Sequence, residues 1–361
     1  MTPLYFAERS YVGGGERYVA NLARAVSRAA EGRSTIDIIS YGSFAQTSRL
    51  DRGVALKVLP TAREPRHVLD AVSWEIGDVI READVVHVHQ PFTRSGELAI
   101  VAAKLLGKPV CVTDLGGVAS RLGLSLGILE LVDEVIALSR FSRSLFHTTT
   151  PVSVIKGGVD DEFFFPPADG KARRDRFVYV GRLLPHKGVD RLLLALPRDL
   201  PLTICGRPYS EDYYRLLQKL AVGKEVEFRL TATDTELRAL YRRAWAVVLP
   251  SVYVDVFGKS YVAPELMGLT LLEGAACAAP AICSRVGGLP EFVIDGKTGF
   301  VFDSLPDLRR RLRTLARDAD LVARLGAEGQ KLVMDEYGLN AVGTRILARY
   351  EEVLAAKERR T

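Results

Sequence analysis

The sequence predicts two doubly wound α/β domains, each built on a parallel sheet with helices on both faces. The chain has 361 residues, more than the ~250–300 that a single hydrophobic core usually accommodates. Its hydrophobic content of 48% and charged content of 26% are those of an ordinary globular protein. Short runs of Val, Ile and Leu alternate with helix-like segments along the whole chain, which is the pattern of parallel strands joined by crossover helices.

The first half contains short apolar runs that predict strands, separated by longer segments with apolar residues at helical spacing. The predicted strands are Pro3–Ala7, Thr35–Ser40, Val54–Leu59, Val85–Val88, Val110–Thr113, Glu134–Ala137 and Val152–Lys156. The predicted helices are Arg17–Ala30 and Gly96–Leu106.

A break without hydrophobic periodicity follows at Gly157–Arg176, where the sequence GGVDDEFFFPPADGKARRD combines glycines, prolines and charges. This composition predicts an interdomain linker. We therefore expect one domain over residues 1–160 and a second over 161–339, with a last helix, Asn340–Lys357, that packs back near the first domain.

The second half repeats the alternation of strands and helices. Its predicted strands are Arg176–Val180, Pro201–Cys205, Glu225–Arg229, Ala246–Leu249, Ala281–Ser284 and Gly299–Phe302. Its predicted helices are Val189–Leu196, Tyr213–Leu220, Thr235–Arg242 and Gly268–Ala278.

Composition and charge exclude several classes of protein. The net charge of +5 comes without clustered Lys and Arg, so no nucleic-acid partner is expected. The four cysteines are scattered and form no C-x-x-C pair, which excludes a disulfide scaffold. No apolar run approaches the ~18 residues of a membrane span, and no signal peptide is recognised, so we expect a cytoplasmic protein. Asn and Gln are scarce and Arg is abundant, a bias typical of thermophiles.

Three motifs carry residues suited to binding an anionic ligand. Gly13-Gly14-Gly15-Glu16 lies between the first predicted strand and helix, where glycines let a phosphate approach the helix N-terminus. It does not match the G-x-G-x-x-G dinucleotide fingerprint, and the alternative is a plain strand-to-helix turn.

The second motif, VGRLLPHKG, places Arg182 and Lys187 after the first strand of the second half. Two such cations can close on a diphosphate; the alternative is a solvated basic loop.

The third motif is a pair of glutamates, Glu265 and Glu273, separated by seven residues, ELMGLTLLE. Gly268 marks a turn, so Glu265 lies in a loop and Glu273 about one turn into the helix that follows. Together the two carboxylates and the helix N-terminus could hold the hydroxyls and phosphate of one extended ligand. Two glutamates at this spacing also occur on ordinary helical surfaces.

In this order, the three motifs resemble glycosyltransferase family 4, the group 1 type of retaining GT-B glycosyltransferases. The segments DVVHVHQP at 84–91, VIKGGVD at 154–160 and the run from Glu265 to Gly299 are also similar to those of the family. The resemblance implies a GT-B fold, with two facing doubly wound Rossmann-like domains and a cleft between them. It assigns the acceptor to the first domain and the nucleotide-sugar donor to the second.

The resemblance also implies roles for individual residues. Arg182 and Lys187 would contact the donor diphosphate, Glu265 the donor sugar and Glu273 the ribose, and the catalytic residues would be Arg182, Lys187 and Glu265. Further donor contacts would come from backbone amides and glycines at these positions: Gly14, Gly15, Gly268, Leu269 and Thr270. No metal and no cofactor are expected, because two cations and helix N-termini offset the charge of the diphosphate.

Two departures from the family pattern concern the sugar and the acceptor. Thirteen residues, VYVDVFGKSYVAP at 252–264, stand where the family has only a few; we expect this insert to lie beside the donor sugar as part of a lid. It contains Asp255-Val-Phe-Gly258, which imitates the start of the glutamate motif, but no glutamate follows at the required spacing. Leu115 occupies the place where many members carry a histidine. We expect Asp114 or a histidine of the His87-x-His89 strand, His89 first, to serve the acceptor side; the alternative is that no such group is needed.

Two other patterns suggest metal ligands. His87 and His89 alternate on a strand and so share one face, but no third ligand is evident in the sequence. Asp318-Ala-Asp320 imitates the D-x-D metal motif, yet it lies in an Arg-rich, helix-like segment far from the donor motifs. We interpret it as solvated surface.

The sequence thus predicts transfer of a sugar from a nucleotide diphosphate sugar to a glycan, lipid-linked or small-molecule acceptor. Two alternatives are a sugar-nucleotide epimerase and a non-catalytic nucleotide-sugar-binding subunit. A lipid-linked acceptor would place the protein at the inner face of the cell membrane as a peripheral protein. The nearest candidate for that contact is the first helix with Arg17, Arg24 and Arg28, whose spacings of seven and four allow one shared side; the alternative is a solvated helix face.

Overall fold

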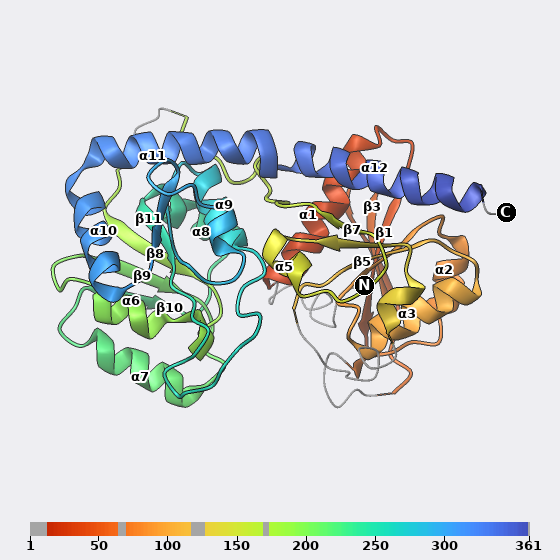
Figure 1. The fold of residues 1–361 in the computed structure, drawn as a ribbon, viewed down its shortest axis with the longest axis horizontal. Helices are drawn as coiled ribbons and strands as arrows, with labels where there is room; N and C mark the ends of the chain where they lie inside the picture. The colour runs from red at the N-terminus through yellow and green to blue at the C-terminus, as the bar shows by residue number, and fades with distance from the viewer. Residues whose placement is uncertain (1–12, 64–69, 117–126, 169–172, 360–361) are drawn as a thin grey trace. The chain divides into compact units, whose positions relative to one another are not determined.

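A computed structural model describes residues 13–63, 70–116, 127–168 and 173–359. The chain divides into two compact units (Figure 1), Met1–Gly158 with Leu339–Thr361 and Val159–Gly338. The chain passes between them at 158–159 and again at 338–339, where the sequence analysis placed the boundaries at 160–161 and 339–340.

The described residues of the first unit form two sheets. One has the order β1-β3-β2, from Ile36–Gly42, Val54–Pro60 and Gln46–Asp51. The other is the all-parallel sheet β4-β5-β6-β7, from Val86–His89, Val110–Thr113, Glu134–Ala137 and Val152–Val154.

Strand β2 corrects the expectation of purely parallel pairing, because it runs antiparallel to β3. Its sequence, QTSRLD, is polar and has no buried residue, so no apolar run marked it. The predicted strand Pro3–Ala7 lies outside the described residues.

The helices of the first unit include two that are far apart in the sequence and pack together. They are α1 (Gly14–Ala29) and α12 (Leu339–Glu358), side by side in Figure 1. The backbones approach so closely that a Cβ on Gly343 would lie 2.2 Å from the carbonyl oxygen of Ala25. The other α-helices among the described residues of this unit are α2 (Ile76–Glu82), α3 (Arg94–Leu105) and α5 (Arg140–Ser144).

The second unit is built on one parallel sheet of six strands in the order β10-β9-β8-β11-β12-β13. The strands are β8 (Arg176–Val180), β9 (Leu202–Cys205), β10 (Val226–Arg229), β11 (Ala244–Leu249), β12 (Ala281–Ser284) and β13 (Gly299–Phe302). Its helices are α6 (Val189–Ala195), α7 (Glu211–Ala221), α8 (Asp234–Arg242), α9 (Leu269–Ala276), α10 (Leu305–Arg317), α11 (Ala319–Leu332), and the short η4 (Pro185–Lys187), η5 (Leu289–Glu291) and η6 (Val333–Tyr337).

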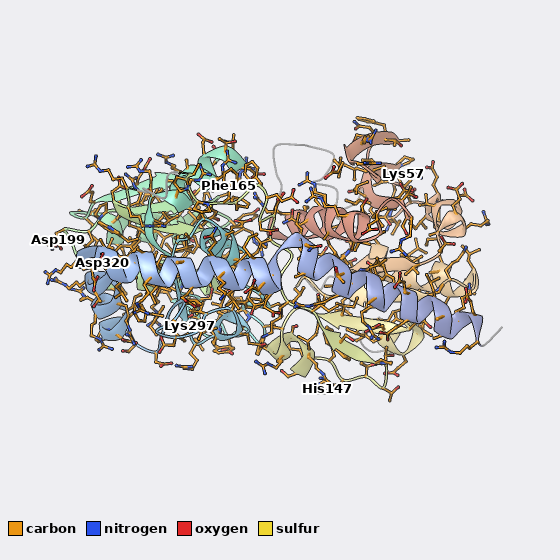
Figure 2. The ribbon with its side chains drawn as sticks, turned by 90° about the horizontal axis from the view of Figure 1, so that it is seen from above. Lys57, His147, Phe165, Asp199, Lys297 and Asp320 are labelled. Carbon is orange, nitrogen blue, oxygen red and sulfur yellow. The ribbon has the colours of Figure 1, made fainter. Side chains whose placement is uncertain are left out.

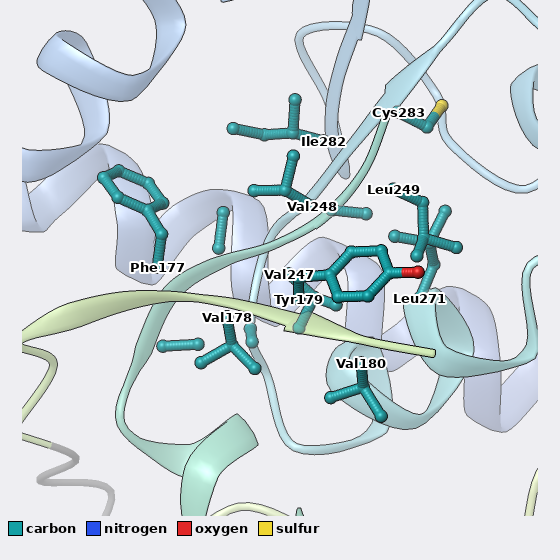
Figure 3. Close-up of a cluster of buried hydrophobic side chains, with 14 of the residues drawn as sticks. Phe177, Val178, Tyr179, Val180, Val247, Val248, Leu249, Leu271, Ile282 and Cys283 are labelled. Carbon is teal, nitrogen blue, oxygen red and sulfur yellow. The ribbon is translucent and has the colours of Figure 1, made fainter. Parts of the chain in front are cut away.

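The two central strands of this sheet form the core of the second unit. Phe177, Tyr179 and Val247 are fully buried there (Figure 3). Because both faces of the central strands are covered, their sequences are continuous apolar runs. The strand order reverses between β8 and β11, so the loops that follow these two strands diverge at the carboxyl edge. In open α/β sheets, ligands bind at such a switch point.

The predicted linker is largely part of the second unit. Phe164 is 2% exposed in its core, and the side chain of Phe165, labelled in Figure 2, lies 5.1 Å below the guanidinium of Arg238. Arg174 donates to the carbonyl of Ala244 at 2.7 Å. Its described residues up to 168 and at 173–175 are irregular backbone held by these contacts, which explains why no periodicity is seen there. The chain passes between the units at the first residues of the segment.

Candidate functional site

The loops that follow β8 and β9 meet closely at the carboxyl edge of the second unit's sheet. A Cβ on Gly206 would lie 1.8 Å from the carbonyl oxygen of Gly181, so only glycine fits there. Leu183 and Pro208 form an isolated bridge between the same loops. The sequence therefore shapes this edge through glycines placed directly after the strands.

The loop after β8 carries both predicted cations. Arg182 is exposed, and its guanidinium lies 5.9 Å from the centre of the Tyr209 ring. Lys187 ends the 3-10 turn η4, and Gly188 then takes a left-handed conformation, φ +67°, to start α6. A Cβ on Gly188 would lie 2.0 Å from the carbonyl oxygen of Pro250. This close approach fixes the cation loop against the end of β11.

Lys187 and Glu265 form an ion pair in which the Nζ and Oε1 atoms are 2.6 Å apart. Their side chains are 15% and 9% exposed, respectively. Ser251, which follows β11, donates its hydroxyl to the same Oε1 atom at 2.9 Å, and Ser284 donates to the carbonyl of Ser251 at 2.6 Å. Among the described residues the other carboxylate oxygen, Oε2 of Glu265, has no hydrogen-bond partner. It can therefore accept a hydrogen bond from a hydroxyl of a ligand.

The second glutamate lies deeper. Glu273 is 2% exposed on α9, and Tyr241 of α8 donates its hydroxyl to Oε2 of Glu273 at 2.7 Å. Gly268 is the N-cap of α9 and offers no side-chain cap, so the first amides of this helix, at Leu269 and Thr270, are not satisfied by a capping side chain. The structure brings Lys187 and Glu265 into contact and holds Glu273 against Tyr241.

The carboxylate that imitates the first glutamate is engaged elsewhere. Asp255 accepts hydrogen bonds from the Tyr261 hydroxyl at 2.9 Å and from the amides of Phe257 and Lys259 at 2.9 and 3.0 Å. Burial alone would raise the pKa of Asp255, but these hydrogen bonds hold the pKa below its ordinary value. Among the described residues, Asp255 therefore stabilises the conformation of the loop that contains it.

The residues predicted in the first unit gather around the start of α1. Gly14 is the first residue of this helix, and a Cβ there would meet nothing within 4 Å among the described residues. A Cβ on Gly15 would lie 3.6 Å from a Leu115 methyl group. Packing in the described part of the chain therefore does not require glycine at either position, which leaves the backbone accessible to a ligand.

His89 is the last residue of β4, and Asp114 directly follows the neighbouring strand β5. His89 is 6% exposed and stacks at 4.2 Å on His87, so the two rings share a face as predicted. Burial, and then His87, lower the pKa of His89 well below its ordinary value. Burial raises the pKa of Asp114, against a hydrogen bond from the Gly116 amide.

His87 has both ring nitrogens engaged, with the Tyr350 hydroxyl at 2.6 Å and the Thr113 hydroxyl at 2.9 Å. Burial lowers the pKa of His87 to about 3, so it is neutral at physiological pH. These contacts leave His87 no nitrogen for a metal, and no cluster of three potential ligands occurs in the described part of the chain. In the second unit, Asp318 caps α11 and Asp320 is exposed (Figure 2), as expected for solvated surface.

Sequence reasoning missed three residues of the site in the second unit. Ser251 could have been found, because it closely follows β11 at the carboxyl edge, where open α/β sheets commonly bind ligands. Tyr241 and Ser284 gave no signal, because a tyrosine in an amphipathic helix and a serine at a strand end have no distinctive spacing. Their importance depends on the contacts with Glu273 and with the carbonyl of Ser251.

Comparison with known proteins places this chain in a family. The profile described as glycosyl transferases group 1 matches residues 160–332, and that of glycosyltransferase family 4 matches residues 12–163. A GDP-mannose-dependent alpha-(1-6)-phosphatidylinositol monomannoside mannosyltransferase from Mycolicibacterium smegmatis is 32% identical over 59% of this chain. The chain covers 61% of the length of that relative.

Two solved structures have the same fold. Sucrose-phosphate synthase from Thermosynechococcus elongatus is 21% identical with a TM-score of 0.73, over 96% of this chain and 94% of that one. HepE from Anabaena, in complex with UDP-glucose, is 16% identical with a TM-score of 0.71, over 96% and 97%. The fold class and the family resemblance are thereby confirmed: this chain belongs to the group 1 glycosyltransferases of family 4, which have the GT-B fold.

Proposed function

We propose that this enzyme transfers a sugar from a nucleoside diphosphate sugar to an acceptor hydroxyl, with retention of configuration at the anomeric carbon. The observation that carries the proposal is the Lys187–Glu265 pair at the switch point of the second unit, with Arg182 on the same loop. Two cations suit a diphosphate, and a carboxylate with one open oxygen suits a sugar hydroxyl. We therefore propose that the donor binds to the second unit, and that the acceptor binds to the first.

The proposed chemistry follows from these charges. The bond between the anomeric carbon and the diphosphate oxygen breaks, and the leaving diphosphate takes the electron pair. Arg182 and Lys187 neutralise the developing charge, as preorganised cations do in a site with little water. The acceptor oxygen then bonds to the anomeric carbon on the same face, and its proton passes to a phosphate oxygen. The two cations and the amides at the start of α9 supply the needed charge, so the proposal includes no metal and no cofactor.

The names of similar proteins support this donor class and its stereochemistry. One relative is named for GDP-mannose and an alpha linkage, and one fold neighbour was solved with UDP-glucose. Thermal shift with UDP-, GDP- and ADP-sugars would identify the base, because a ligand that binds only the native state raises the melting temperature. A transfer assay with the labelled sugar that gives the largest shift then tests the reaction. A free epimer, or binding without turnover, would contradict the proposal in favour of an epimerase or a non-catalytic subunit.

We further propose a lipid-linked or glycan acceptor, because the mannosyltransferase relative is named for a phosphatidylinositol mannoside. No described helix is long and apolar enough to cross a membrane. For a lipid-linked acceptor we propose peripheral contact with the membrane surface. The predicted contact on α1 is weakened by Asp51, which lies 3.6 Å from Arg24 and 3.7 Å from Arg28. Co-sedimentation with anionic liposomes at low and high salt tests the contact; no pelleting at low salt, with full activity on a water-soluble acceptor, would contradict it.

A further inference from the structure

The insert at 252–264 forms a hairpin that is fixed by one carboxylate. Asp255 is 5% exposed and accepts hydrogen bonds from two amides and one hydroxyl of the same hairpin, those of Phe257, Lys259 and Tyr261. The bond from Tyr261 ties the tyrosine hydroxyl to the same carboxylate. A loop with this many internal hydrogen bonds has one conformation and can hold a neighbour in place.

One side of the hairpin rests on the residue that precedes Lys187. The ring of Tyr261 lies against the His186 imidazole with ring centres 4.6 Å apart and planes at 41°. At the base of the hairpin, the Val252 amide donates to the His186 carbonyl at 2.9 Å. Both the side chain and the backbone of His186 are thus held by the insert.

The other side of the hairpin reaches the segment that holds Glu265. The Gly287 amide donates to the Tyr253 hydroxyl at 2.9 Å, and the next amide, of Gly288, donates to the Glu265 carbonyl at 3.0 Å. A Cβ on Gly287 would lie 2.1 Å from that carbonyl oxygen. The insert therefore contacts the supports of both members of the Lys187–Glu265 pair.

We propose that the 252–264 hairpin, through Tyr261, positions His186 and thereby the adjacent Lys187 for binding the donor diphosphate. Tyr261 is a positioning residue in this account, since it acts through His186. The inference rests on the proposed function, which assigns Lys187 to the diphosphate.

The charge state of His186 gives this account a specific consequence. Burial lowers the pKa of His186 to about 4, helped by the cations Lys187 and Arg182 from its own loop. Two charged residues of the hairpin also act on this pKa: Asp255 raises it and Lys259 lowers it further. The imidazole is therefore neutral at pH 7. Loss of the Tyr261 ring exposes the imidazole, so its pKa rises toward the ordinary ~6.5. Below that pH, a third cation would then stand beside Arg182 and Lys187.

The experiment measures binding of UDP and, in parallel, GDP by isothermal titration. We expect Tyr261→Ala to weaken binding about tenfold, within the range of couplings between contacting residues. Tyr261→Phe keeps the stacking ring and should stay within about threefold of wild type, since it loses only one hydrogen bond. The matched control is Val262→Ala, a hairpin side chain that is 81% exposed, which should bind as wild type. If Tyr261→Ala does not fold, Tyr261→Leu replaces it, with the same expected weakening.

A double-mutant cycle separates this inference from the proposed function. In the Lys187→Ala background, Tyr261→Ala should lower the affinity for UDP or GDP by less than about twofold, because the lysine that Tyr261 positions is already absent. Relative to wild type, binding to Tyr261→Ala should also tighten as the pH falls from 7.5 to 5.5, as His186 becomes charged. If Lys187→Ala binds UDP and GDP as wild type does, the proposed function itself fails. If Lys187→Ala weakens binding but the Tyr261 effect is absent, or is additive and independent of pH, the inference alone is overturned.

Discussion

At the residue scale, Lys187 and Glu265 lie in direct contact, so a substitution at either has two consequences. It removes one group that the ligand would touch, and it leaves the partner without its counter-ion in a site that is less than one-sixth exposed. An unpaired, mostly buried charge is costly. Arg182 differs, because it is exposed and has an aromatic neighbour in Tyr209.

We predict that Arg182→Ala and Lys187→Ala each weaken binding of UDP or GDP and reduce turnover. A hydrogen bond to a charged group contributes about 1.5–3 kcal/mol, which corresponds to a loss of roughly 10- to 150-fold. Lys187→Ala should be the more severe, since it also leaves Glu265 unpaired. Isothermal titration measures the affinity. Arg215→Ala, at a side chain 67% exposed on α7, is the control and should bind normally. Wild-type affinity and rate in both variants would show that the donor assignment is wrong.

We predict that Glu273→Ala raises the KM for the donor, while Glu265→Ala chiefly lowers kcat. A contact to ribose is equal in the ground and transition states, so its loss changes binding. A contact to the sugar can strengthen as positive charge develops on the ring, so its loss changes the rate. Steady-state kinetics with the donor identified by thermal shift separates the two parameters. The opposite pattern would exchange the two roles.

At the element scale, the cation loop depends on the glycine that joins it to α6. Gly188 combines a left-handed backbone with a close approach to Pro250. Either feature alone disfavours a side chain, and here both act one residue from Lys187.

Gly188→Ala should therefore destabilise the protein by more than the ~1–2 kcal/mol that a left-handed alanine costs, and should weaken UDP or GDP binding. Gly223→Ala is the matched control, because Gly223 is also left-handed, φ +74°, but a Cβ there would meet nothing within 4 Å among the described residues. Urea unfolding of both variants separates the clash from the backbone strain. Equal losses of stability in the two variants would show that the structure accommodates the Gly188 Cβ beside the Pro250 carbonyl without further loss of stability.

At the scale of the whole molecule, the last helix belongs to the first unit although it follows the second in the sequence. Arg349 on α12 donates to both carboxylate oxygens of Glu134 on β6, at 2.8 and 3.0 Å. Glu134 is 1% exposed, so this pair fixes the end of the chain to the centre of the parallel sheet.

Arg349→Ala should lower the free energy of unfolding of the first unit by about 3–5 kcal/mol, the usual cost of leaving a buried charge unpaired. Differential scanning calorimetry should show one transition shifted, because residues 159–338 keep their own core. The control is Arg285→Ala, which breaks an exposed pair with Asp303, side chains 60% and 62% exposed, and should cost at most about 1 kcal/mol. A shift of both transitions would contradict the assignment of α12 to one unit.

The sequence by itself determined the alternation of strands and helices and the positions of the loops that carry the candidate site residues. This was possible because buried parallel strands contain continuous apolar runs, such as Phe177–Val180 and Ala281–Cys283. The strands of a parallel sheet also present their loops at one edge. The motifs that contain Arg182, Lys187 and Glu265 could also be recognised from the sequence, because each is a short continuous segment of the chain.

Only the tertiary structure decided which of these groups touch. The Lys187–Glu265 and Tyr241–Glu273 contacts join residues 78 and 32 positions apart, and no local pattern encodes such pairs. Strand β2 and the packed segment around Phe164 were not predicted, because neither has a hydrophobic periodicity. The first is fixed by pairing with β3 and the second by contacts with the core of the second unit. The same holds for the 252–264 hairpin. The position of Tyr261 depends on its contact with Asp255 in the hairpin and with His186, which lies in a loop distant in the sequence.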